Sequence, residues 1–127
     1  MALRTELTLR LPNSPGAAAD ICQKLADLRI NVAAMTLQPS GTLHLIVDNH
    51  ILAAGTLREQ RMTVTEQQVI YSVVSHTPGG TAGILRMLAR AGANVNYLYG
   101  GGGDAQATAA LVIGVDDPVR VAAQTGL

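Results

Sequence analysis

Two short segments carry most of the chemistry that this sequence offers, and the second repeats the first. Asn13-Ser14-Pro15-Gly16 and His76-Thr77-Pro78-Gly79 lie 63 residues apart, and each joins an apolar run to a segment with helical spacing. The first backbone N–H groups of a helix have no partner within the helix and carry the positive end of its dipole. A glycine beside them leaves these donors accessible to a small anion such as a carboxylate. Each segment is therefore a candidate carboxylate-binding site.

The residues of each segment also predict how its helix begins. We expect Ser14 and Thr77 to cap the helices, because a hydroxyl can accept from a free N–H group. Pro15 and Pro78 would then occupy the first helical position, where a missing N–H group costs nothing. The alternative is that each segment is only an efficient turn between a strand and a helix. A single copy would favour that alternative, whereas the repeat favours a binding role.

The hydrophobic spacing around each segment predicts a unit of order βαββαβ. Residues 5–11 alternate apolar and polar side chains, which is typical of a half-buried strand. In the first half we expect helices over 18–28 and 50–60 and further strands over 30–37, 43–47 and 62–65. In the second half we expect strands over 69–74, 95–99 and 107–115, helices over 81–90 and from Pro118, and a loop at the glycines 100–103.

The two halves are an internal duplication, which we divide into residues 1–67 and 68–127. An alignment without a gap pairs Pro15 with Pro78, Gly16 with Gly79, Leu25 with Leu88 and Asn31 with Asn94. The second copy stops at Leu127, which leaves no room for its fourth strand. A missing edge strand leaves backbone groups unpaired, so a partner chain, the N-terminal residues or an extended strand from the first half must cover them.

Composition argues against several classes of function. The chain has no net charge, no Trp and no Phe, whereas nucleic-acid binding needs basic residues and is often helped by aromatic ones. Cys22 is the single cysteine and the three histidines lack metal-ligand spacing, so we expect no disulfide, metal or cofactor. No nucleophile, base and orienting acid can be grouped, so we do not expect an enzyme. Without a signal peptide or a membrane-spanning run, we expect a cytoplasmic protein that binds neither nucleic acid nor membrane.

Both halves resemble the ACT domain over nearly the whole chain. The resemblance lies in the order strand, x-x-Pro-Gly, helix, strand, loop, strand and helix, with Ala-Gly-Ala-Asn-Val and Asp-Asp-Pro in the second half. Stand-alone proteins made of two ACT units are the most similar members. The resemblance implies an α+β fold of two ferredoxin-like units side by side, with antiparallel sheets and helices on one face. It also implies an amino acid or related metabolite bound at the seam between units or subunits, and control of an enzyme or regulator.

The resemblance also implies roles for particular residues. Serine-binding members carry one Asn two residues before the proline and another at the start of the second strand. Here these positions are Asn13 and Asn31 in the first unit and His76 and Asn94 in the second. Together with the turns, the candidate ligand-binding residues are Asn13, Ser14, Pro15, Gly16, Ala17, Asn31, His76, Thr77, Pro78, Gly79, Gly80, Asn94 and Tyr97.

Local chemistry leaves alternatives open at three of these residues. An Asn side chain both donates and accepts, so Asn31 or Asn94 can bridge the carboxylate and ammonium groups of an amino acid. Each could equally be a turn residue in the left-handed conformation. Tyr97 aligns with Ala34, so a pocket lined by Tyr would differ between the halves, and ordinary sheet packing is its alternative.

The sequence thus predicts a small-molecule sensor that binds an amino acid near the Pro-Gly turns. We expect a homodimer, because zero net charge and open sheet edges favour self-association. The alternative is an interaction module that binds no ligand and regulates a partner enzyme through direct contact.

Overall fold

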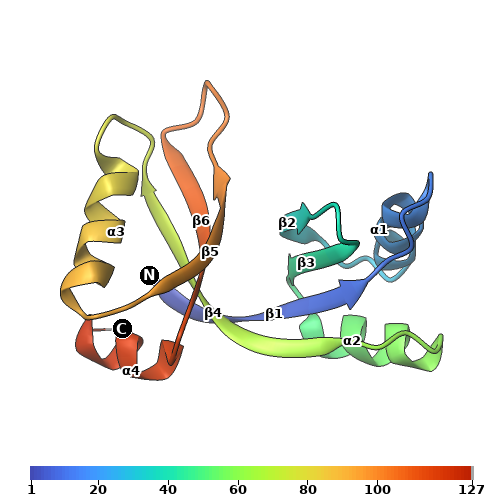
Figure 1. The fold of residues 1–127 in the computed structure, drawn as a ribbon. Helices are drawn as coiled ribbons and strands as arrows, with labels where there is room; N and C mark the ends of the chain where they lie inside the picture. Colours follow the sequence, from blue (N-terminus) through green and yellow to red (C-terminus); the bar gives the residue numbers. More distant parts are fainter. Residues whose placement is uncertain (127) are drawn as a thin grey trace. The chain divides into compact units, whose positions relative to one another are not determined.

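The computed structural model describes residues 1–126, which form strands and helices in the order βαββαβαββα (Figure 1). The strands are β1 (Ala2–Arg10), β2 (Val32–Leu37), β3 (Thr42–Val47), β4 (Thr65–Ser75), β5 (Val95–Gly101) and β6 (Thr108–Val115). The helices are α1 (Ala17–Asp27), α2 (His50–Glu59), α3 (Gly80–Arg90) and α4 (Pro118–Gln124). The chain divides into two compact units.

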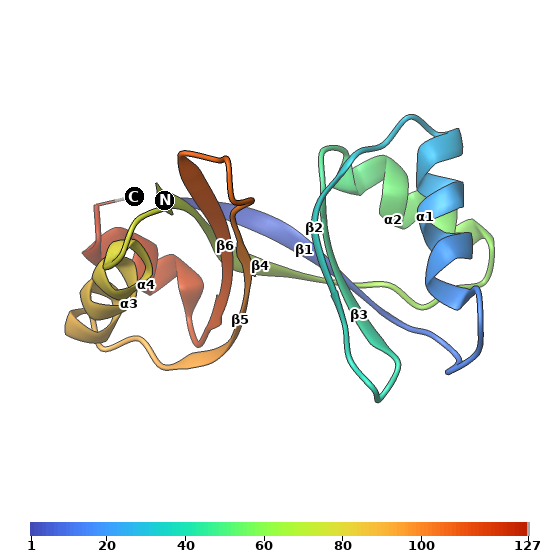
Figure 2. The same ribbon diagram turned by 90° about the horizontal axis from the view of Figure 1, so that it is seen from above.

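The first compact unit, here called the N-terminal unit, runs from Thr5 to Gln67. Its strand order is β2-β3-β1-β4, and β3 pairs antiparallel with both β2 and β1. Helices α1 and α2 cover the same face of these strands (Figure 2). Alternation along β1 sends Leu7 and Leu9 toward the helices, where they pack with Leu25 of α1 in the buried core.

The second compact unit, here called the C-terminal unit, combines Met1–Arg4 with the chain from Gln68 onward. Its strand order is β5-β6-β4-β1, and β6 pairs antiparallel with β4 and β5. Helices α3 and α4 cover one face of this sheet (Figure 2). Ile70, Leu88 and Ile113 form the centre of its core and are fully buried. The predicted α+β fold of two ferredoxin-like units is confirmed.

The N-terminal residues supply the fourth strand of the C-terminal unit. Met1 and Leu3 pack against that unit's core, and the Arg4 guanidinium lies 4.9 Å from the centre of the Tyr71 ring. The start of β4 plays the matching part in the N-terminal unit, where the Gln67 amide donates to Glu6 at 3.2 Å. The edge that the second half of the sequence leaves open is therefore covered from within the same chain.

The strand expected over 62–65 begins only at Thr65 and continues to Ser75. Met62 and Val64 instead pack into the core of the N-terminal unit from an irregular connection. Their hydrophobic character therefore reflects core packing, not membership of a strand.

The glycine run also differs from expectation, because its first half is strand. Gly100 and Gly101 extend β5 and pair with Leu111 and Ala110 of β6. A Cβ atom at Gly100 would overlap the Ala110 carbonyl oxygen, so only glycine fits this position. The turn of the hairpin begins after these two residues.

Candidate ligand-binding site

Both Pro-Gly segments place a glycine in the left-handed conformation directly before a helix. Gly16 precedes α1 with φ of 87°, and Gly79 precedes α3 with φ of 92°. Glycine adopts this conformation without the steric cost that a Cβ atom brings. No side chain caps either helix. The first helical hydrogen bonds instead run from Asp20 N–H to the Gly16 carbonyl and from Gly83 N–H to the Gly79 carbonyl, both at 2.9 Å.

Each Pro-Gly pair forms the centre of a type II β-turn. Such a turn places Pro at its second position and requires positive φ at its third, which Gly supplies. The Ala17 N–H closes the first turn on the Ser14 carbonyl at 3.3 Å, and the Gly80 N–H closes the second on the Thr77 carbonyl at 3.0 Å. Ser14 and Thr77 therefore begin turns and do not cap helices, so that prediction is wrong. The prolines likewise precede the helices by two residues instead of opening them.

The first turn leaves backbone donors of α1 accessible. Apart from Gly16 itself and its neighbours along the chain, no described heavy atom lies within 4 Å of the position that a Cβ atom at Gly16 would occupy. The N–H groups of Ala18 and Ala19 make no hydrogen bond to any part of the chain that the structure describes. These donors lie at the positive end of the helix dipole, so they can bind a carboxylate without breaking an internal hydrogen bond.

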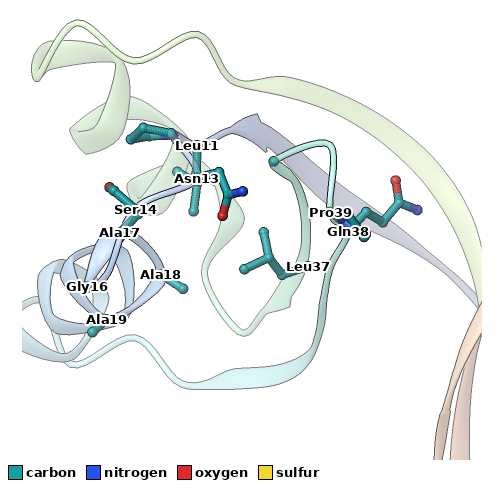
Figure 3. Close-up of a pocket in the computed structure, with 12 residues that line it drawn as sticks. Leu11, Asn13, Ser14, Gly16, Ala17, Ala18, Ala19, Leu37, Gln38 and Pro39 are labelled. Carbon is teal, nitrogen blue, oxygen red and sulfur yellow. The ribbon is translucent and has the colours of Figure 1, made fainter.

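A cavity of about 180 Å³ lies beside these donors, between the start of α1 and the β2–β3 hairpin (Figure 3). Leu11, Leu37 and Pro39 contribute apolar surface, and Asn13 and Ser14 contribute polar groups. Figure 3 shows the Leu37 side chain reaching from the end of β2 into the space, whereas the Gln38 amide points away from it. The cavity therefore joins a polar end at the helix start to an apolar wall from the sheet.

The hairpin wall of this cavity is held in place by a close backbone contact. The Leu11 N–H donates to the Gly41 carbonyl at 2.8 Å. Gly41 has φ of 92°, and a Cβ atom there would overlap the Leu11 carbonyl oxygen. Because this contact needs no ligand, the cavity is already formed in the structure.

The predicted residues of the first copy fall into two groups. Asn13, Ser14, Gly16 and Ala17 line the cavity. Asn31 does not line it, because it precedes β2 whereas the cavity lies at the far end of that strand, roughly 20 Å away at about 3.3 Å per residue. The backbone of Asn31 is paired with Asp48: its N–H donates to the carboxylate at 3.1 Å, and its carbonyl accepts from the Asp48 N–H at 3.2 Å.

The turn of the second copy makes different contacts with the residues around it. The His76 N–H donates to the Ala107 carbonyl at 3.0 Å, and the His76 ring lies against Gly102, so the longer β5–β6 hairpin meets the turn. The Thr77 hydroxyl is 3.0 Å from the Ser75 hydroxyl. A Cβ atom at Gly80 would overlap the Ser75 carbonyl oxygen.

The remaining predicted residues of the second copy take part in contacts along β5. The Asn94 amide donates to Asn96 at 3.1 Å, and the Asn96 amide donates to Asp116 at 3.0 Å. The Tyr97 ring lies against Gly114, where a Cβ atom would collide with it. Neither Asn94 nor Tyr97 lines the cavity beside α1, which belongs to the N-terminal unit.

Sequence reasoning missed the hairpin side of the cavity. Leu37, Pro39 and Gly41 come close to the turn only through the pairing of β2 with β3 and of β3 with β1. The Pro39-Ser40-Gly41 turn was the available signal, because it marks where the hairpin returns toward the end of β1.

Charged groups lie elsewhere in the N-terminal unit. The fully buried Glu6 carboxylate is 3.0 Å from Nδ1 of His44, which is also 3.0 Å from the Thr8 hydroxyl. Across residues 1–126, no group of three or more His, Cys, Asp or Glu residues is placed to hold a metal ion. Within the same range, no helix is both long enough and apolar enough to span a membrane.

Comparison with known proteins identifies similar folds. No family model and no curated protein matches the sequence. Among solved structures, protein BT0572 from Bacteroides thetaiotaomicron superposes with a TM-score of 0.84 at 22% identity, covering 98% of this chain and 89% of that one. The regulatory subunit of aspartate kinase from Thermus thermophilus gives a TM-score of 0.62 at 20% identity, covering 94% of this chain and 89% of that one.

A longer enzyme shows the same likeness over part of its length. Aspartokinase III from E. coli, in complex with lysine and aspartate, gives a TM-score of 0.61 at 19% identity. The match covers 98% of this chain and 31% of the enzyme. At these identities the likeness is one of fold, and it agrees with the duplicated Pro-Gly units of the sequence. This chain therefore has the fold of a tandem ACT-domain protein.

Proposed function

We propose that this protein is a regulatory sensor that binds a small amino acid in the cavity beside Gly16. The observation that carries the proposal is the pair of open N–H groups, at Ala18 and Ala19, next to a preformed cavity with an apolar wall. The N–H groups bind the ligand carboxylate. The Asn13 amide is available to accept from the ligand ammonium, and the ligand side chain lies against Leu37.

The solved structures of similar fold support a regulatory role. One is described as the regulatory subunit of aspartate kinase, and another as an aspartokinase in complex with lysine and aspartate. We propose by analogy that this cytoplasmic chain acts on a partner enzyme and has no catalytic activity of its own. Binding of the amino acid would favour one state of that partner by its difference in affinity for the two states.

We further propose that two copies associate through β2. This strand is at the edge of the N-terminal unit, and its Met35 and Leu37 side chains are 39% and 49% exposed. Edge strands present unpaired backbone groups that favour pairing with another chain. Antiparallel pairing of β2 with β2 of a second copy would bring Asn31 of that copy to the cavity at Leu37. Asn31 would then contact the ligand across the seam, which it cannot do within its own unit.

Calorimetric titration with the twenty amino acids tests the proposal, and two glycine variants supply a matched pair. Gly16→Val and Gly79→Val introduce a β-branched side chain at the same turn position and nearly the same φ, so their backbone strain is similar. We expect at least one amino acid to bind, Gly16→Val to lose at least tenfold in affinity, and Gly79→Val to bind normally. Failure of every amino acid to bind, or equal losses in both variants, would contradict the proposed site.

The interaction module remains the second candidate, because the two units expose apolar side chains on their helices. Ile51 and Leu52 of α2 are 75% and 42% exposed, and Val119 of α4 is 59% exposed. Pull-down of a partner enzyme in the presence and absence of amino acids separates the two functions. A sensor binds its partner differently under the two conditions, whereas a ligand-free module does not.

A further inference from the structure

We propose that the cavity selects amino acids with a short, uncharged, aliphatic side chain and excludes lysine and aspartate, with Leu37 as the residue that determines this specificity. This inference rests on the function proposed above and deepens it. It follows from three features of the cavity walls: their charge, the space they enclose and the identity of the residue at the end of β2.

The first feature is the absence of a counter-charge. Among the described residues that line the cavity, none is an Asp, Glu, Lys, Arg or His. A ligand side chain carrying an ammonium or a carboxylate would lose water against Leu11, Leu37 and Pro39 without gaining a charged partner. Burial of an unpaired charge is strongly unfavourable, so the walls disfavour charged side chains.

The second feature is the size of the cavity. Its volume of about 180 Å³ is below the range of roughly 300 to 1,000 Å³ that is typical of sites for drug-sized ligands. An apolar cavity of roughly 150 Å³ holds a ring of six carbon atoms. The space therefore suits a ligand of roughly six to nine non-hydrogen atoms, and valine and leucine fall within that range.

The third feature is Leu37, which has no equivalent in the second copy. The position that matches it there is Gly100, which pairs with Leu111 as Leu37 pairs with Leu43. Figure 3 shows the Leu37 side chain directed into the space beside the start of α1. Contact with the Leu37 side chain should raise the affinity by up to roughly fourfold for each additional methylene of the ligand. Valine should therefore bind more tightly than alanine.

Calorimetry on the full chain with alanine, valine, leucine, lysine and aspartate tests the inference. For the unmodified protein we expect valine to bind about tenfold more tightly than alanine, and lysine and aspartate to bind at least tenfold more weakly than valine. Leu37→Asp should weaken valine at least tenfold and raise the affinity for lysine relative to valine, because it supplies the missing counter-charge.

Leu98→Asp is the matched control, because it makes the same substitution on the edge strand of the other unit. Leu98 lies on β5 of the C-terminal unit, is similarly exposed and does not line the cavity. Leu98→Asp should leave the order of affinities unchanged, and circular dichroism of both variants confirms folding. Lysine or aspartate binding as tightly as valine would overturn the inference and leave the sensor function intact, as would an unchanged preference in folded Leu37→Asp. Binding of no amino acid would overturn both proposals.

Discussion

The two Pro-Gly turns have nearly identical backbones and different surroundings. Gly16 and Gly79 adopt the same left-handed conformation, and the space where a Cβ atom would lie is open at both. Beside Gly16, Leu37 and a short hairpin form the wall of a cavity. On the matching side of Gly79, Gly100 occupies the position that corresponds to Leu37, and the longer β5–β6 hairpin contacts His76. The two turns thus present similar backbone donors, and under the proposed function the neighbouring hairpin would determine specificity.

The units also differ in the source of their fourth strand, and this difference predicts the largest effect. Removal of Ala2–Arg4 takes away the edge strand of the C-terminal unit, including Leu3 and the contact of Arg4 with Tyr71. We expect a loss of about 3 kcal/mol in the stability of that unit, from apolar burial and strand hydrogen bonds. Hydrogen exchange should show faster exchange in β6 and unchanged protection in β3. Equal losses of protection in β6 and β3 would mean that removal of Ala2–Arg4 destabilises both units and not the C-terminal unit alone.

The next effect concerns the hairpin that forms the cavity wall. Gly41→Ala places a Cβ atom against the Leu11 carbonyl oxygen at a residue with positive φ. We expect a loss of about 2 kcal/mol in the free energy of unfolding, together with weaker amino-acid binding, because the wall must shift. Gly100→Ala in the other unit should cost similar stability but leave binding unchanged. Urea denaturation and calorimetry on the two variants measure both quantities, and equal binding losses would show that the cavity is not the site.

A reciprocal exchange at the first helical residue tests how the surroundings of the two turns differ. Gly80→Ala introduces a Cβ atom that overlaps the Ser75 carbonyl oxygen. Ala17→Gly instead removes a Cβ atom that packs against the core of the N-terminal unit. We expect Gly80→Ala to lower the free energy of unfolding by about 2 kcal/mol and Ala17→Gly by less than about 1 kcal/mol. Thermal unfolding measures both, and the reverse order would contradict the close approach of the Ser75 carbonyl oxygen to Gly80.

The smallest expected effect distinguishes the two asparagines at the starts of β2 and β5. Asn31→Ala removes an exposed side chain, but the backbone N–H of residue 31 can still donate to the Asp48 carboxylate. The free energy of unfolding should therefore change by less than about 0.5 kcal/mol. If Asn31 contacts the ligand across a dimer seam, Asn31→Ala should lower the amino-acid affinity about tenfold, because one hydrogen bond to a charged group is lost. Asn94→Ala should leave affinity unchanged. Light scattering should show a dimer, and a strict monomer would remove the role of Asn31.

Local patterns predicted most of the fold because its elements follow the hydrophobic period closely. The alternation around Leu7 and Leu9 and the helical spacing around Leu25 both correspond to real elements. Met1 to Arg4 could not be assigned to the second unit by any local pattern, because their strand partner lies in β4.

The candidate site was predicted less completely than the fold. The sequence correctly placed each Pro-Gly turn before a helix. Ser-Pro-Gly is compatible with both a capped helix and a type II turn, and only the conformation of the glycine distinguishes the two. Leu37 and Gly41 join the site only through strand register, which no spacing along the chain reveals.

Amide chemical shifts recorded by ¹H–¹⁵N NMR during a titration with valine show directly which helix start binds the amino acid. We expect the amides of Ala18 and Ala19 to shift in a saturable manner, and the shifts of the corresponding amides of Thr81 and Ala82 in the second copy to stay unchanged. Saturable shifts at Thr81 and Ala82 with none at Ala18 and Ala19, or no shifts at either helix start for any amino acid, would contradict it.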